Sequence, residues 1–112
     1  MKLVHHLVLP DWWATFDSKD YYESETLSVE QFIHFSMPEQ VEGTLNRYFV
    51  GTPSILLLHI DADLLTAPLV FESAGNHGVF PHLYGRLNKS AIIGIDELKP
   101  NVQGYFTFNT SS

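Results

Sequence analysis

The sequence predicts one α+β domain with a mixed or largely antiparallel β-sheet and a few short helices. The length of 112 residues is typical of a single domain, so we expect residues 1–112 to fold as one unit. Segments with strand-like composition alternate with helix-like segments along the chain. The helix-like segments are few and short, which favours the α+β class.

The composition narrows the classes of partner. With 45% hydrophobic and 13% aromatic residues, the chain has enough apolar material for a core. The net charge of −7 disfavours nucleic acid polymers and anionic membranes as partners. The chain has no cysteine, which fits a reducing compartment. Since residues 1–10 do not resemble a signal peptide and no run approaches a membrane span, we expect a cytoplasmic protein. The partner that we expect is a small-molecule ligand.

The first quarter of the chain predicts a strand, a helix and a loop. Leu3–Leu9 is mostly apolar and rich in β-formers, which indicates a strand. Pro10 suits the first turn of a helix that runs from Asp11 to about Phe16. The polar segment 17–24 predicts a loop, and 26–30 fits a turn or a short helical piece.

A short strand and the longest helix follow. In the predicted strand 32–36, alternation places His34 and Ser36 on one face. Ser36 and the three residues after it resemble a capping box that opens a helix reaching about Phe49. Its predicted buried stripe consists of Val41, Leu45, Tyr48 and Phe49.

The second half of the chain is richer in strands. Segment 54–61 is the clearest, because its continuous apolar run indicates that both faces are covered. The remaining predicted elements are a capped helical turn at 61–66, a strand at 69–72, a loop at 74–78, a turn at 88–91, a strand at 92–98, an edge strand at 103–108 and a frayed end at Ser111 and Ser112.

Two runs, 32–36 and 80–85, each set a histidine among bulky apolar residues. A histidine in such surroundings must find a hydrogen-bond partner or lose its charge. If folding brings His34 and His82 together, they line a polar pocket. Either histidine can instead be a structural residue whose ring is satisfied by hydrogen bonds.

Further candidates lie near these runs. Glu72 ends a strand, where it can act as a general base or orient a ribose hydroxyl, or else be a solvated carboxylate. Tyr84 offers a hydroxyl and a stacking face, and Arg86 either neutralises a phosphate or lies on the surface. His5, His34 and His82 are chemically suited to a metal, but no short ligand pair supports a metal site.

The chain resembles a bacterial family known as domain of unknown function 952, over a core of about 3–98 with a tail at 99–112. The residues that carry the resemblance are His5 with Trp12, the segment 30–36, Gln40, Tyr48 with Phe49, the segment 56–61, Glu72 and the segment 80–85. Two positions depart from the family pattern. Gln31 stands where glycine is common, and Arg86 stands where proline is common.

The family is similar in fold to the ADP-ribosyltransferase superfamily, which implies split β-sheets enclosing a cleft for an NAD-like nucleotide. By that resemblance, His5, Ser36 and Glu72 take the positions of the superfamily's site residues. Together with the histidine runs, this makes Glu72 and His82 the catalytic candidates. The ligand-binding candidates are His5, His34, Ser36 and Tyr84. The implied reactions are transfer or hydrolysis of an ADP-ribosyl or phosphate group.

Four functional hypotheses remain open at this stage. The first is a nucleotide site of this type, with or without catalysis. The second is a non-enzymatic module that binds a small polar metabolite. A metal-dependent hydrolase or metal store is the third, and a purely structural role for the histidines is the fourth. The sequence does not identify the substrate or the oligomeric state.

Overall fold

The structure, a computed structural model, describes residues 2–108 and contains three short α-helices within that range. They are α1 (Pro10–Ala14), α2 (Leu27–Glu30) and α3 (Val41–Tyr48). The strands are β1 (Leu3–Val8), β2 (Tyr21–Tyr22), β3 (Ile33–His34), β4 (Ile55–Asp61), β5 (Leu69–Ser73), β6 (Val79–Leu83), β7 (Leu87–Asn88) and β8 (Ile92–Leu98). Single 3₁₀ turns occur at Pro38–Gln40, Ala62–Leu64, Gly75–His77 and Lys89–Ala91. The predicted α+β class with few short helices is confirmed.

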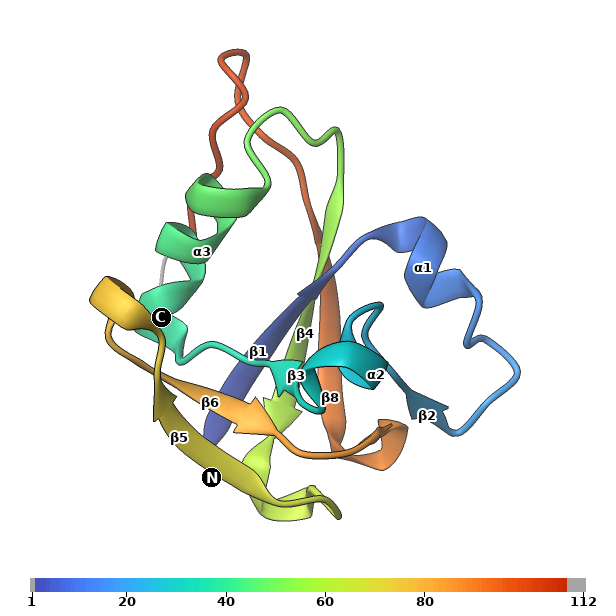
Figure 1. Ribbon diagram of the computed structural model, residues 1–112. Helices are drawn as coiled ribbons and strands as arrows, with labels where there is room; N and C mark the ends of the chain where they lie inside the picture. The colour runs from blue at the N-terminus through green and yellow to red at the C-terminus, as the bar shows by residue number, and fades with distance from the viewer. Residues whose placement is uncertain (1, 109–112) are drawn as a thin grey trace.

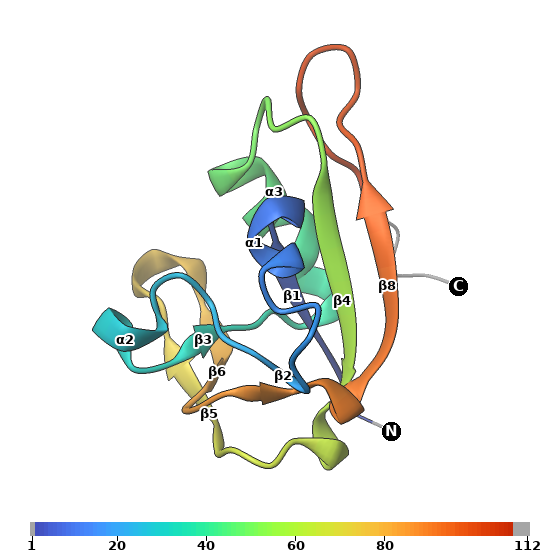
Figure 2. The ribbon, with the colours of Figure 1, turned by 90° about the vertical axis from the view of Figure 1, so that its right-hand side faces the viewer.

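The described strands form three antiparallel sheets. Strand β4 lies between β1 and β8, β6 lies between β3 and β5, and β2 pairs with β7. In Figure 1 strand β6 crosses in front of β1, and Figure 2 shows the β3–β6–β5 sheet to the left of the β1–β4–β8 sheet. Of the predicted mixed and largely antiparallel arrangements, the antiparallel one is observed.

Among residues 2–108, one isolated β-bridge joins these two sheets, and residues of both sheets belong to the same hydrophobic cluster. The amide of His5 donates to the carbonyl of Ser36 at 2.8 Å, and the amide of Ser36 donates back at the same distance. The segment 33–36 therefore pairs with β6 at its start and with β1 at its end. This double pairing brings β1 next to the strands that carry the two histidine runs.

Two hydrophobic clusters cover opposite faces of the β1–β4–β8 sheet. On one face, Val4 and Leu58 belong to the larger cluster. On the other face, Val41 and Leu45 of α3 pack against Leu57, and all three are fully buried. Because β4 contributes to both clusters, its continuous apolar run is explained.

Several local predictions differ from the structure. Helix α1 ends at Ala14, two residues early, and the predicted loop 17–24 contains β2. The helical segment begins after Met37, whose amide donates to Gln40 Oε1 at 2.9 Å, so Ser36 is not the cap. The predicted burial of Tyr48 is wrong, because it is 66% exposed and lies on the outer side of α3.

The predicted edge strand at 103–108 is also wrong. Asn46 on α3 accepts a hydrogen bond from the amide of Phe106 at 2.8 Å and donates to its carbonyl at 2.9 Å. These two bonds take the place of strand pairing and hold the buried Phe106 ring in the cluster beneath α3. The predicted frayed end at Ser111 and Ser112 lies outside the described residues.

Candidate functional site

The two histidine runs lie side by side. Strands β3 and β6 pair so that His34 faces His82, with their ring centroids 4.7 Å apart. Strand β5 pairs with the other edge of β6 and places Val70 beside His82. Because paired residues in an antiparallel sheet share a face, the side chains of His34, His82, Glu72 and Tyr84 all project from the same side of this sheet.

Glu72, His82 and Tyr84 form a hydrogen-bonded cluster on that face. Glu72 Oε1 is 2.8 Å from His82 Nδ1 and accepts from the Tyr84 hydroxyl at 2.6 Å. The hydrogen bond from the Tyr84 hydroxyl is the largest cause that lowers the pKa of Glu72, and the hydrogen bond from His82 is the second. The bond between Tyr84 and Glu72 also raises the pKa of Tyr84. Because an ionised carboxylate only accepts hydrogen bonds, Nδ1 of His82 carries its proton.

The other ring nitrogen of His82 is available for chemistry but covered. Nε2 is buried and has no hydrogen-bond partner among residues 2–108. Phe32 stacks on the ring at a centroid distance of 4.1 Å and an angle of 14°. His34 lies edge-on to the same ring and places its own Nε2 3.4 Å from Glu30 Oε2. The imidazole of His82 is thus oriented by Glu72 and closed off by Phe32.

A cavity of about 610 Å³ begins at His34 and extends toward α3. Its lining includes basic groups, a carboxylate, hydroxyls and several aromatic rings. These residues are His6, Leu7, Thr26, Glu30, His34, Phe35, Ser36, Thr44, Arg47, Tyr48, Phe49, Ala74, His77 and Phe80. We call this space the histidine cavity. Of the six residues predicted from the sequence, His34 and Ser36 line it. His82 and Glu72 pair across the strands with the lining residues His34 and Phe80, and Tyr84 is connected to them through its hydrogen bond to Glu72.

His6 lines the cavity, but both of its ring nitrogens are hydrogen-bonded within the protein. Its Nδ1 is 2.6 Å from the carbonyl of His34, and its Nε2 is 2.9 Å from the Tyr22 hydroxyl. A neutral ring that donates at Nδ1 and accepts at Nε2 satisfies both contacts. Burial lowers the pKa of His6 to about 4, so the neutral form persists at pH 7.

His5 projects from the opposite face of β1 and does not line the cavity. Its ring is 1% exposed and lies against His59 and Phe108, at centroid distances of 4.9 and 5.7 Å. Neither ring nitrogen has a partner among residues 2–108. Burial and then the neighbouring His59 lower the pKa of His5 to about 4. What His5 gives to the cavity is its backbone bridge to Ser36.

The two departures from the family pattern have distinct local roles. Gln31 ends α2 with φ of 70°, a left-handed conformation that glycine adopts more easily. Arg86 donates to Glu23 Oε2 at 3.0 Å, and its guanidinium lies 4.0 Å from the centre of the Tyr21 ring. Arg86 therefore fastens β2 to the chain after β6 and does not line the histidine cavity.

Sequence reasoning missed several contributors to the site. Strand alternation places Phe32 on the same face as His34, but its stacking on His82 was not predicted. Arg47 and Tyr48 line the cavity because the outer side of α3 faces it. Within 2–108, no three histidine or acidic side chains lie close enough to hold a metal ion, and no helix is long and apolar enough to cross a membrane.

Comparisons with known proteins give a family and a fold. A family model described as "Protein of unknown function (DUF952)" matches residues 7–95. The crystal structure of protein CC0527 from Caulobacter crescentus is 26% identical, with a TM-score of 0.85 over 95% of this chain and 94% of that one. The solution NMR structure of CC0527 gives a TM-score of 0.80 at 26% identity, over 94% and 91% of the two chains. No curated protein matches the chain.

Proposed function

The chain belongs to the DUF952 family of proteins of unknown function, and from its geometry we propose that it binds a small phosphorylated molecule of the nucleotide class, such as ADP-ribose or NAD, in the histidine cavity. The observation that carries the proposal is the lining of this cavity. It combines aromatic rings, hydroxyls and a cluster of basic side chains in one space of about 610 Å³, which is within the usual size of small-molecule sites.

The charge distribution supports an anionic ligand. The whole chain has a net charge of −7, yet Arg47, His34 and His77 all line this cavity. A guanidinium forms charge-assisted, often paired, hydrogen bonds with phosphate oxygens, and imidazoles add donors. A local basic cluster on an acidic protein concentrates a small anion at one place without attracting nucleic acid polymers.

The remaining lining suits the rest of a nucleotide. Tyr48 is largely exposed on α3 and Phe80 contributes a second ring, so an aromatic base has stacking partners. Glu30 can accept hydrogen bonds from ribose hydroxyls, and Ser36 and Thr44 contribute hydroxyl groups to the lining of the cavity.

Calorimetric titration with AMP, ADP-ribose and NAD tests the proposal, with NMR to locate the site. We expect binding that shifts the ring signals of His34 and His77. Arg47→Gln should weaken binding about tenfold or more, whereas the control Lys99→Gln, which removes an exposed charge outside the cavity, should not. The absence of heat and of shifts with all three ligands would refute a nucleotide site.

A catalytic role is a second candidate, and the Glu72–His82 pair favours it. With Nδ1 bound to Glu72, the free Nε2 of His82 is arranged as a general base. In hydrolysis of NAD, water adds to ribose C1′ as its proton moves to Nε2, and the C1′–N bond breaks with its electron pair leaving on nicotinamide. Phe32 must first move, because it covers the imidazole.

Chromatography of NAD after incubation with the protein tests this role. We expect nicotinamide and ADP-ribose to form, and His82→Gln to abolish their formation while calorimetric NAD binding persists. If NAD binds and is recovered unchanged, the catalytic candidate is wrong and the binding function remains.

A further inference from the structure

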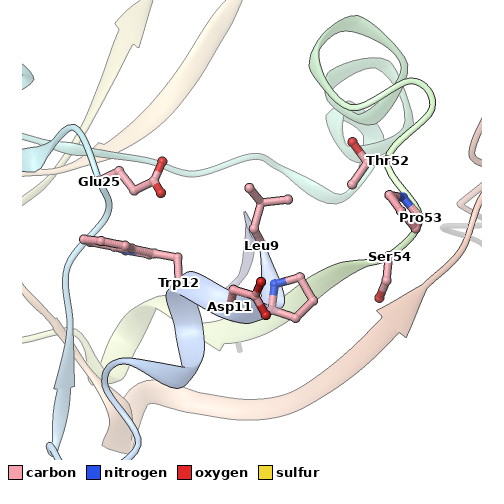
Figure 3. Close-up of a pocket in the computed structure, with 8 residues that line it drawn as sticks. Leu9, Asp11, Trp12, Glu25, Thr52, Pro53 and Ser54 are labelled. Atoms are coloured by element: carbon pink, nitrogen blue, oxygen red, sulfur yellow. The ribbon is translucent and has the colours of Figure 1, made fainter.

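A second cavity, of about 460 Å³, lies beyond the end of β1. Figure 3 shows its lining residues: Leu9, Pro10, Asp11 and Trp12 at the start of α1, Glu25 before α2, and Thr52, Pro53 and Ser54 before β4. We call it the acidic cavity. The only ionisable side chains among these residues are two carboxylates, so its charge is opposite to that of the basic cluster in the histidine cavity.

The two carboxylates face the cavity from different elements. Asp11 comes from the first turn of α1 and Glu25 from the connection that leads to α2. In Figure 3 the Glu25 carboxylate lies above Trp12, and the Asp11 carboxylate lies below Leu9. Neither carboxylate forms an ion pair or a side-chain hydrogen bond with any residue between 2 and 108. Their charge is therefore not neutralised within the described part of the chain.

Trp12 gives the cavity a rigid aromatic wall. Its indole nitrogen donates to the carbonyl of Glu23 at 2.8 Å, and its ring packs against Phe16 at a centroid distance of 5.7 Å. Figure 3 shows the indole nearly edge-on, with the Glu25 carboxylate above it. A ring held in this way exposes a preformed face, so a ligand that stacks on it does not have to order the side chain.

This combination selects a particular ligand chemistry. An indole face attracts cations through its ring quadrupole, and unpaired carboxylates beside it add a Coulombic contribution of the same sign. The apolar surfaces of Leu9, Pro10 and Pro53 suit alkyl groups and exclude the water shell that a small inorganic ion keeps. An ammonium group that carries methyl or alkyl substituents satisfies all of these surfaces.

The acidic cavity also adjoins the histidine cavity. Leu7 lines the histidine cavity and Leu9 lines the acidic cavity. Of two consecutive residues, Thr26 lines the histidine cavity and Glu25 lines the acidic cavity. The chain after α3 also passes from one to the other, since Phe49 lines the first and Thr52 the second. The same three segments therefore contribute neighbouring residues to both cavities.

We propose that the acidic cavity is a binding site for an organic cation, with the indole of Trp12 against the alkylammonium group and Asp11 and Glu25 around it. The site stands independently of the ligand in the histidine cavity. Its recognition depends on positive charge as well as on shape, which separates it from a general apolar pocket.

Choline and its neutral isostere, 3,3-dimethyl-1-butanol, test this site by NMR titration. We expect choline to shift the Trp12 indole N–H, assigned with Trp12→Phe, and the amides of Asp11, Glu25 and Thr52. The alcohol should bind about tenfold more weakly or without detectable shifts. AMP should not shift the Trp12 indole, so failure of nucleotide binding and failure of cation binding are separate results.

Paired variants provide a second test. The double variant Asp11→Asn with Glu25→Gln should weaken choline binding about tenfold. The control Asp17→Asn with Asp63→Asn removes the same charge from exposed positions outside the cavity and should leave it unchanged. Equal shifts with choline and the alcohol would overturn the proposal, as would equal choline binding by the two double variants.

Discussion

Acidification should destabilise this protein above the pH at which its carboxylates become protonated, because His6 is buried in the neutral form. The pKa of His6 is lowered from 6.5 to about 4 by burial. A histidine whose pKa is lower in the folded state binds fewer protons there than in the unfolded chain at intermediate pH. The contribution of neutral His6 to the free energy of unfolding is therefore fully present above about pH 6.5. It falls as the pH decreases from 6.5 to 4 and changes no further below that window.

The size of this effect follows from the two pKa values. Between pH 7 and pH 5, linkage predicts a loss of about 2 kcal/mol from His6 alone, rising to about 3 kcal/mol near pH 4. His5 adds to the loss in the same direction, because its pKa is also lowered to about 4. Glu72 acts lower in the pH range, since its pKa lies below the ordinary carboxylate value and its contribution is lost only as the pH falls through that lower range.

Urea unfolding at pH 7, 6 and 5 measures the loss directly, and NMR titration of the His6 ring measures its pKa. In His6→Gln, the loss between pH 7 and pH 5 should be smaller by about 2 kcal/mol, and the dependence that remains should come mainly from His5. The control His77→Gln, which removes an exposed histidine on the 3₁₀ turn after β5, should keep it. A constant free energy of unfolding from pH 7 to pH 5, or a His6 ring that titrates near 6.5 in the folded protein, would refute the reasoning.

Three further changes test other contacts. Asn46→Ala removes both hydrogen bonds to the backbone of Phe106, so urea denaturation should show a loss of about 1–3 kcal/mol, and an unchanged midpoint would contradict this role. Gln31→Gly relieves the left-handed backbone after α2 and should raise the free energy of unfolding by up to about 1 kcal/mol; a decrease in thermal stability would count against the strain. Glu72→Ala, which removes the acceptor, should move the pKa of Tyr84 back toward its ordinary value in an ultraviolet titration, and no change would exclude the hydrogen bond as the cause.

The sequence was sufficient to predict the elements whose residue pattern alone indicates their structure. The strand predicted at 54–61 is confirmed as β4, Ile55–Asp61. A run of consecutive apolar residues needs burial on both faces, and clusters on either side of the sheet provide it. Strands β2 and β7 were missed because each has two residues, and a pair this short depends on contacts made elsewhere in the fold. The segment 103–108 has strand-like residues, yet the side chain of Asn46 supplies the hydrogen bonds that a neighbouring strand would give.

For the candidate site too, local pattern places some residues, whereas others depend on tertiary packing. Strand alternation was enough to place His34 and Ser36 on one face, and both line the histidine cavity. Alternation cannot say which of two adjacent histidines on β1 faces a site. His6 lines the cavity, whereas His5 packs on the far side of the strand against His59 and Phe108. That choice is made by the pairing of β1 with β4 and by the packing of the C-terminal segment, which no local pattern encodes.

The segment 32–36 explains why a site forms at this place in the fold. Phe32 stacks on His82, His34 pairs with the same residue across the strands, and Ser36 makes the bridge to β1. These few residues thus carry the β-bridge between the two larger sheets, which also share a buried hydrophobic cluster, and the histidine cavity opens beside them. A ligand that contacts β1, this segment and α3 together binds only when the sheets are joined. Its binding free energy therefore adds to the stability of that junction, and a ligand at 100 times its Kd would stabilise the fold by about 2.7 kcal/mol.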